Sequence, residues 1–229
     1  MMTGETLRNA RQRRRWTQAE AGARLGISQA YVALLEKGRR AFPSALARKV
    51  VRVFRLSPEL LPLRRALSAS AADDLARDLS RLGYPGFAFL KGGWMKNPAE
   101  VLVAALARPQ LDSRIAEALP WLLLAYPQLD RDWLVTQARL LNITNRLGFV
   151  VDLARRVAEK AGEANSTRYL ALSRLSDSLR AGRLEAEDTL AQQSLTAAER
   201  NWLRANRSED AEAWHLLTDW RPELLQYTK

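Results

Sequence analysis

Residues 17–38 constrain the fold most, because they hold the start and stop signals of two short helices in close succession. Thr17 can cap a helix, and Glu20 stands where its side chain can bond back to the cap in a capping box. Gly26 favours the left-handed conformation that ends a helix, and Ser28 is suited to cap the next one. The pattern therefore predicts two helices joined by a tight turn.

The flanking residues extend this pattern to five helices within about the first 65 residues. In the first of them, Leu7 and Ala10 are expected to face the core. A short fifth helix is expected to open at Ser57, where a proline follows the capping serine. The expected helices cover residues 4–15, 17–25, 29–37 and 44–54, and a short stretch from 57 onward.

The remaining residues also have helical signals, and no strand pattern competes with them. Residues 67–72 are small and polar, which suits either a linker or the start of the next helix, and we place a domain boundary between residues 68 and 69. Residues 144–161 carry aliphatic side chains at helical spacing. Other expected helix starts are Asp73, Asn97, Asp112, Asp130, Ser166, Thr196 and Ser208. The sequence thus predicts an all-α protein, with one helical domain over residues 1–68 and a second over residues 69–229.

The positive charge of the chain is concentrated in the first of these domains. Residues 1–68 hold 15 of the 36 Lys and Arg residues but 4 of the 25 Asp and Glu residues, which leaves 21 of each sign in the rest of the chain. The net charge of +11 therefore lies in the N-terminal domain. A charge surplus confined to one module is typical of a surface that binds nucleic acid.

The segment from Thr17 to Gly38 closely resembles the helix-turn-helix of the Cro and phage-repressor type, also called the xenobiotic-response-element family. The resemblance depends on several steric features that occur together at the expected spacing. They are a small residue where the helices cross (Ala21), the turn glycine (Gly26), an apolar plug (Ile27), two residues that seat the second helix (Val32 and Leu35), and a closing segment from Glu36 to Gly38.

This resemblance implies that the helix beginning after Ser28 enters the major groove of double-stranded DNA. Gln29 is the best candidate for direct readout, because a glutamine amide can pair with adenine N6 and N7. The other expected base contacts are Ala30, near a thymine methyl, Tyr31 and Ala33. The expected phosphate contacts are Arg11, Gln18, Ser28, Lys37, Arg39 and Arg40. Since Ala30 and Leu34 replace polar readers of related repressors, DNA shape is expected to contribute more.

The second domain resembles the helical extensions of such regulators, including regulators encoded beside toxin genes. One helix-turn-helix offers little surface, so we expect a homodimer on a palindromic operator, joined through residues 70–229. Three roles remain open: a repressor of its own operon, an antitoxin that also binds a toxin or other protein partner, and a ligand-sensing regulator. Six of the seven tryptophans lie beyond residue 90, and they are expected in the core or on a partner surface.

An enzyme is the least favoured class. The chain has no cysteine and a single histidine, His215, and it lacks a Gly-rich phosphate loop. The carboxylate pairs Asp130 with Asp132 and Glu187 with Asp188 are expected at helix N-termini and on solvated faces. We expect no cofactor and no metal. The longest apolar run is too short for a membrane span, so a cytoplasmic protein is expected.

Overall fold

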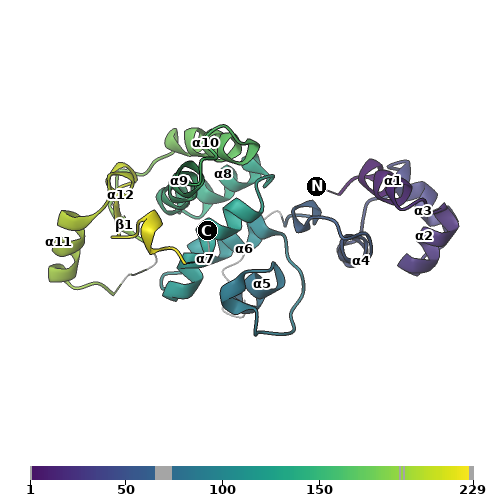
Figure 1. Cartoon of the computed structure of the whole chain (residues 1–229), viewed down its shortest axis with the longest axis horizontal. Helices are drawn as coiled ribbons and strands as arrows, with labels where there is room; N and C mark the ends of the chain where they lie inside the picture. Colours follow the sequence, from purple (N-terminus) through teal and green to yellow (C-terminus); the bar gives the residue numbers. More distant parts are fainter. Residues whose placement is uncertain (1, 65–73, 191, 193, 227–229) are drawn as a thin grey trace. The chain divides into compact units, whose positions relative to one another are not determined.

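The computed structural model describes residues 2–64, 74–190, 192 and 194–226. The described chain divides into two compact units (Figure 1). Residues 2–64 form the N-terminal unit together with Met95–Asn97, and the remaining described residues form the C-terminal unit. The expected linker at residues 67–72 and the boundary at residue 68 lie outside the described residues.

The N-terminal unit consists of four α-helices and one 3-10 turn. They are α1 (Gly4–Arg13), α2 (Gln18–Leu25), α3 (Gln29–Glu36), α4 (Ser44–Phe54) and η1 (Pro58–Leu60). The expected fifth helix is thus a single 3-10 turn, opened by Ser57 and Pro58. The core of the unit contains Leu7, Leu35 and Val50, each with 0% of its surface exposed. Burial of such aliphatic side chains is the main force that holds short helices together.

The predicted helix ends in this unit are confirmed. The hydroxyl of Thr17 accepts a hydrogen bond from the backbone N–H of Glu20, and the Glu20 carboxylate accepts one from the N–H of Thr17. Gly26 has φ 66° and ψ 37°, and Ser28 caps α3 by accepting from the N–H of Tyr31 at 3.2 Å. Local sequence signals therefore define both helices and the turn between them.

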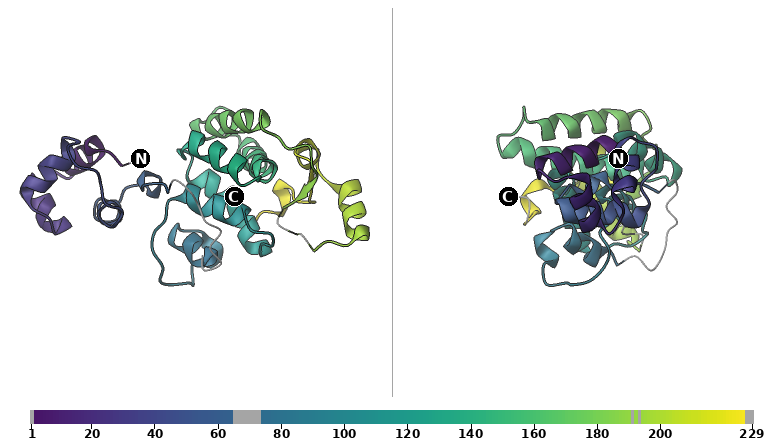
Figure 2. Two further views of the ribbon diagram at one scale, coloured as in Figure 1. Left: turned by 180° about the vertical axis from the view of Figure 1, so that it is seen from behind. Right: turned by 90° about the vertical axis from the view of Figure 1, so that its right-hand side faces the viewer.

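The C-terminal unit is also helical, and its centre is the long helix α9 (Thr144–Lys160). Helices α6 (Pro98–Leu106), α7 (Ser113–Ala125), α8 (Arg131–Leu140) and α10 (Thr167–Arg180) pack against α9 (Figure 1). Figure 2 shows the same arrangement from two further directions. The remaining helical elements of the unit are α5 (Leu75–Arg81), η2 (Pro85–Phe87), α11 (Ala197–Asn206), α12 (Glu209–Ala213) and η3 (Pro222–Leu224).

The caps expected in this unit are confirmed in most cases. Side chains of Asp112, Asp130, Ser166, Thr196 and Ser208 accept hydrogen bonds from N–H groups in the first turns of their helices. The helix expected at Asp73 begins at Leu75, with Asp74 as its cap. Within the described residues, every helix is too short or too polar to cross a membrane.

One expectation about secondary structure was wrong. Two short strands, β1 (Asp188–Thr189) and β2 (Leu216–Leu217), pair in parallel near the end of the chain. Each strand has two residues, so neither has the alternation that identifies a strand in a sequence. The packing of α9 and α12 against this region brings them together. The all-α class is confirmed, with this small addition.

Candidate nucleic-acid interface

The turn between α2 and α3 depends on two glycines. A Cβ atom on Gly22 would lie 2.6 Å from the carbonyl oxygen of Ile27, so the backbone approaches too closely for any side chain. Gly26 has the left-handed conformation, and the N–H of Ile27 donates to the carbonyl of Gly22 at 2.9 Å. Ala21 is fully buried where the helices meet. These contacts hold α3 at a defined angle to α2.

A buried carboxylate at the end of α3 connects three helices. The side chain of Glu36 is 1% exposed. Arg11 of α1 donates to it from Nε at 2.6 Å and from Nη2 at 3.1 Å, and Gln18 of α2 donates from Nε2 at 2.9 Å. The guanidinium of Arg11 also donates to the carbonyl of Trp16 at 2.8 Å. The cluster of Arg11, Gln18 and Glu36 therefore ties α1 and α2 to the C-terminal end of α3.

These contacts keep Glu36 ionised. Burial would by itself raise the pKa of Glu36, but the hydrogen bonds from Arg11 and Gln18 and the charges of Arg11 and Arg8 lower it below its ordinary value. The pKa of Arg11 is raised by its hydrogen bond to Glu36, against a smaller effect of burial. A buried ion pair of this kind is sensitive to the loss of either partner.

The first turn of α3 is open to solvent. Gln29 and Ala30 are exposed, and the Gln29 amide has no hydrogen-bond partner among the described residues. Tyr31 and Ala33 are partly buried, and Tyr31 packs against the core of the unit. The side chains of Gln29 and Ala30 are therefore the most accessible of the four expected base contacts.

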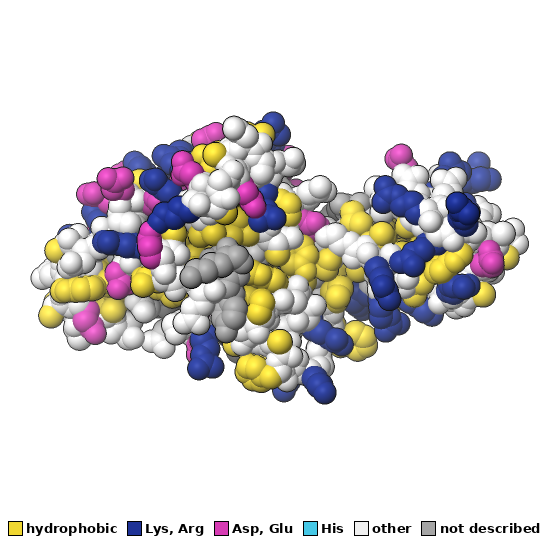
Figure 3. Space-filling view, in the orientation of Figure 1, with side chains coloured by type: hydrophobic (Ala, Val, Ile, Leu, Met, Phe, Trp, Pro, Cys, Tyr) yellow, Lys and Arg dark blue, Asp and Glu magenta, His cyan; other side chains and the backbone are white. Residues whose placement is uncertain are grey.

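Basic side chains flank this helix. Lys37, Arg39 and Arg40 follow α3, all three are exposed, and none of them forms an ion pair with a described residue. Figure 3 shows many Lys and Arg side chains and few Asp and Glu side chains on the visible face of the N-terminal unit, whereas the two signs are more evenly mixed on the C-terminal unit. Unpaired cations beside an exposed helix match the arrangement that contacts DNA phosphates.

Residues 4–64 match the family model described as a helix-turn-helix domain. No curated protein and no solved structure matches the chain. The helix-turn-helix domain supports a DNA-binding regulator, in agreement with the geometry of α2 and α3. The match ends before the C-terminal unit begins.

Arg11, one of the expected phosphate contacts, is bound by other groups of the helix-turn-helix domain. Arg11 was expected on the surface, but its side chain is 14% exposed and its guanidinium is bound by Glu36 and the carbonyl of Trp16. A guanidinium that neutralises a buried carboxylate is not available to a phosphate. Gln18 is only partly engaged, because one N–H of its amide binds Glu36 and the second remains. Ser28 is exposed and serves as the cap of α3.

The contacts of several residues that shape this domain were not predicted from the sequence. Gly4 lets α1 approach α3, since a Cβ there would lie 2.2 Å from the carbonyl oxygen of Leu35. Asn97 donates from its side-chain amide to the carbonyls of Glu59 at 3.0 Å and Leu61 at 2.8 Å. Glu36 did carry a signal, because an acidic residue in the last turn opposes the helix dipole and calls for a cationic partner.

The other residues named in the sequence analysis as possible functional groups lie in the C-terminal unit. Asp130 caps α8, as expected, but Asp188 accepts two hydrogen bonds from Arg146, at 2.6 and 2.8 Å, and so is not simply solvated. His215 lies 3.0 Å from the carbonyl of Leu184 through its Nδ1 atom. The tryptophans divide between the two expectations, with Trp214 fully buried and Trp94 and Trp202 largely exposed.

Proposed function

We propose that the protein is a sequence-specific DNA-binding transcriptional regulator of the Cro and phage-repressor type. In this proposal a cytoplasmic homodimer represses its own operon from a palindromic operator, and the chain has no catalytic role. The single observation that carries the proposal is the exposed first turn of α3, where the amide of Gln29 is unpaired among the described residues. Such an amide can bind adenine in the major groove.

The surroundings of α3 support this role. The cluster of Arg11, Gln18 and Glu36 fixes the helix from its buried side, so Gln29 is presented from a rigid element. Lys37, Arg39 and Arg40 provide positive charge beside it. A rigid reader flanked by phosphate contacts can combine affinity with sequence preference.

The experiment is selection of binding sequences from a random pool of DNA duplexes by the full chain, followed by affinity measurements. We expect a motif with two related half-sites about 10 base pairs apart, bound by a dimer. Gln29→Ala is expected to weaken binding by about 1–3 kcal/mol and to relax the preference at one adenine. Gln12→Ala, on the exposed face of α1, is the matched control. Absence of any enriched motif, or equal behaviour of the two variants, would contradict the proposal.

A ligand-sensing role is the second candidate, because the C-terminal unit contains an open pocket whose lining combines leucines with charged side chains. An antitoxin role requires a protein partner, and the exposed aromatic side chains of Phe89, Trp94 and Trp202 are groups that such a partner would bury. A reporter gene placed behind the selected operator distinguishes repression from activation. Co-expression with the products of neighbouring genes tests the antitoxin role.

A further inference from the structure

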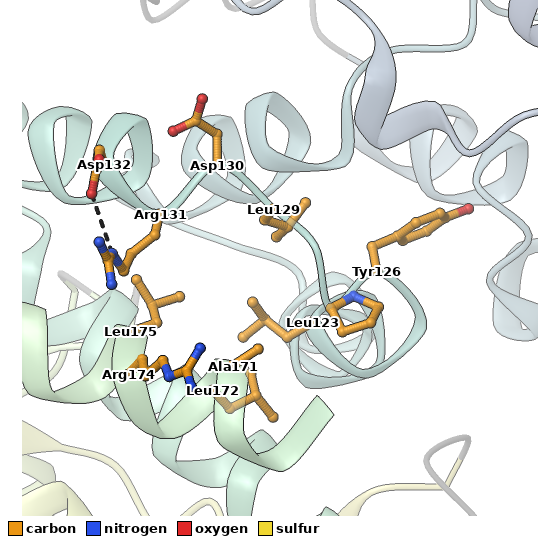
Figure 4. A pocket seen from close by; sticks show the side chains of 11 residues that line it. Leu123, Tyr126, Leu129, Asp130, Arg131, Asp132, Ala171, Leu172, Arg174 and Leu175 are labelled. Atoms are coloured by element: carbon orange, nitrogen blue, oxygen red, sulfur yellow. Dashed lines mark hydrogen bonds and ion pairs between the residues drawn. The ribbon is translucent and has the colours of Figure 1, made fainter. Parts of the chain in front are cut away.

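A pocket of about 230 Å³ lies between the end of α7, the start of α8 and the side of α10 (Figure 4). Apolar and charged side chains share its lining, and the apolar ones include Leu123 of α7, Leu129 of the connecting loop, and Leu172 and Leu175 of α10. Tyr126 also lines it, and the Tyr126 hydroxyl donates to the carbonyl of Leu82 at 2.7 Å, which fixes the ring. Leu123, Leu172 and Leu175 are buried in the core of the C-terminal unit, whereas the four charged residues of the lining are exposed.

One charged group of the pocket has no partner among the described residues. Arg131 pairs with Asp132 at 3.2 Å, and the carboxylate of Asp130 caps α8 by accepting from the N–H of Trp133. Arg174, in contrast, forms no side-chain hydrogen bond or ion pair with any described residue. Figure 4 shows its guanidinium turned toward the leucines of the pocket, whereas the carboxylate of Asp130 points away from them. The pocket thus combines buried leucines with one exposed positive charge that has no partner in the described part of the chain.

The size and charge of the pocket define the ligand. A dry cavity of about 150 Å³ lined by apolar side chains accommodates benzene, so this pocket has room for one ring, or a comparable aliphatic body, and a small polar group. A guanidinium binds a carboxylate through two parallel hydrogen bonds. We propose that this pocket binds a small organic acid, with its apolar body against the leucines and its carboxylate on Arg174.

The binding site follows from the pocket alone, whereas a role of this acid as an effector rests on the proposed function as a DNA-binding regulator. A ligand changes the affinity for an operator only if it binds the free and the DNA-bound protein with different affinities. Binding to the protein and binding to DNA are therefore measured separately.

The first experiment titrates the full chain, without DNA, with phenylacetate and octanoate, and with phenylacetamide as the uncharged counterpart. We expect saturable binding of at least one acid and at least about tenfold weaker binding of the amide, because the amide lacks the charge that Arg174 recognises. Arg174→Gln is expected to weaken binding of the acid to the same extent. Arg168→Gln is the matched control, since it removes an arginine from the same helix that pairs with Glu163 outside the pocket.

A second variant tests the pocket without changing any charged residue. Ala171→Phe places a ring in the pocket and is expected to abolish binding while circular dichroism and the melting temperature show a folded protein. Absence of saturable binding of either acid, equal affinity for acid and amide, or unchanged binding by Arg174→Gln would each overturn the proposed site.

The second experiment repeats the operator titration with and without the acid that binds more tightly. A severalfold change in operator affinity in the original chain, absent in Arg174→Gln, supports an effector role, and an unchanged affinity overturns it. If the chain selects no operator in the absence of acid, the proposed DNA-binding function fails, while the result of the first titration still decides whether the pocket binds acids.

Discussion

Glu36 has a structural role in a position where the sequence suggested only the end of a helix. Its carboxylate receives hydrogen bonds from two other helices, while the side chain of Gln29, seven residues earlier on the same helix, has no partner within the described ranges. One face of α3 is therefore fixed by charge and the other is free to bind. The first prediction concerns the fixed face.

Replacement of Glu36 by glutamine is expected to lower the free energy of unfolding at pH 7 by about 3 kcal/mol, because Arg11 loses its charged partner. The folded state lowers the pKa of Glu36, so its ionised form contributes stability above the ordinary glutamate pKa of about 4.3. That contribution is lost as the pH falls through the lowered pKa. Urea unfolding at several pH values should show a smaller loss of stability in acid for the variant.

The matched control for this prediction is Glu5→Gln, which removes the same charge from an exposed position on α1. It should leave the stability within about 0.5 kcal/mol of the original. If Glu36→Gln behaved like this control, the buried cluster would not stabilise the domain.

A second prediction at this scale concerns Arg40, which is exposed and forms no ion pair with a described residue. If it binds a phosphate, Arg40→Ala should weaken binding to all duplexes to a similar degree. It should also reduce the slope of log affinity against log salt by about 0.9. Arg114→Ala, at an exposed position in the C-terminal unit, should leave the slope unchanged.

At the scale of elements, the close contact of α2 with the following turn reverses an ordinary helix preference. Gly22→Ala would normally stabilise a helix by about 1 kcal/mol. Here the new Cβ would lie 2.6 Å from the Ile27 carbonyl oxygen, so the variant should be destabilised by about 1–3 kcal/mol.

The opposite substitution in the same helix, Ala19→Gly at an exposed position, serves as the comparison. It should cost about 1 kcal/mol through helix propensity alone. Thermal unfolding of both variants tests this prediction. A gain of stability in Gly22→Ala would show that the turn can relax, and would contradict it.

At the scale of the whole molecule, the N-terminal unit is not continuous in sequence. Met95 packs against its core, and the Asn97 amide binds the carbonyls of Glu59 and Leu61. These residues lie beyond the end of the matched helix-turn-helix region at residue 64. A fragment ending there lacks both contacts.

Asn97→Ala in the full chain is therefore expected to destabilise the DNA-binding unit by about 1–3 kcal/mol, since two carbonyls lose a buried donor. Hydrogen exchange read by mass spectrometry should show faster exchange in residues 47–61, with Asn9→Ala of α1 as the control. Equal exchange in the two variants would show that the unit is complete without residues 95–97.

Local signals in the sequence were enough to predict most of the secondary structure. Thr17, Gly26 and Ser28 each act on neighbouring backbone groups, so the limits of α2 and α3 could be predicted within one residue. The same holds for caps such as Asp130 and Ser166. The exposed position of Gln29 also follows from helical spacing, because the apolar residues of α3 identify its buried face.

The sequence by itself determined the helices, the turn and the charge of the N-terminal unit, because these depend on side chains within a few residues of one another or on simple composition. The tertiary structure alone decided that Arg11 binds Glu36 and that Asn97 completes the N-terminal unit. It also decided that Arg174, which has no partner among the residues described, lies beside a pocket with leucines in its lining. Each of these depends on groups that are distant in the chain, and whether a charge is paired or free depends on which groups folding brings within hydrogen-bond distance.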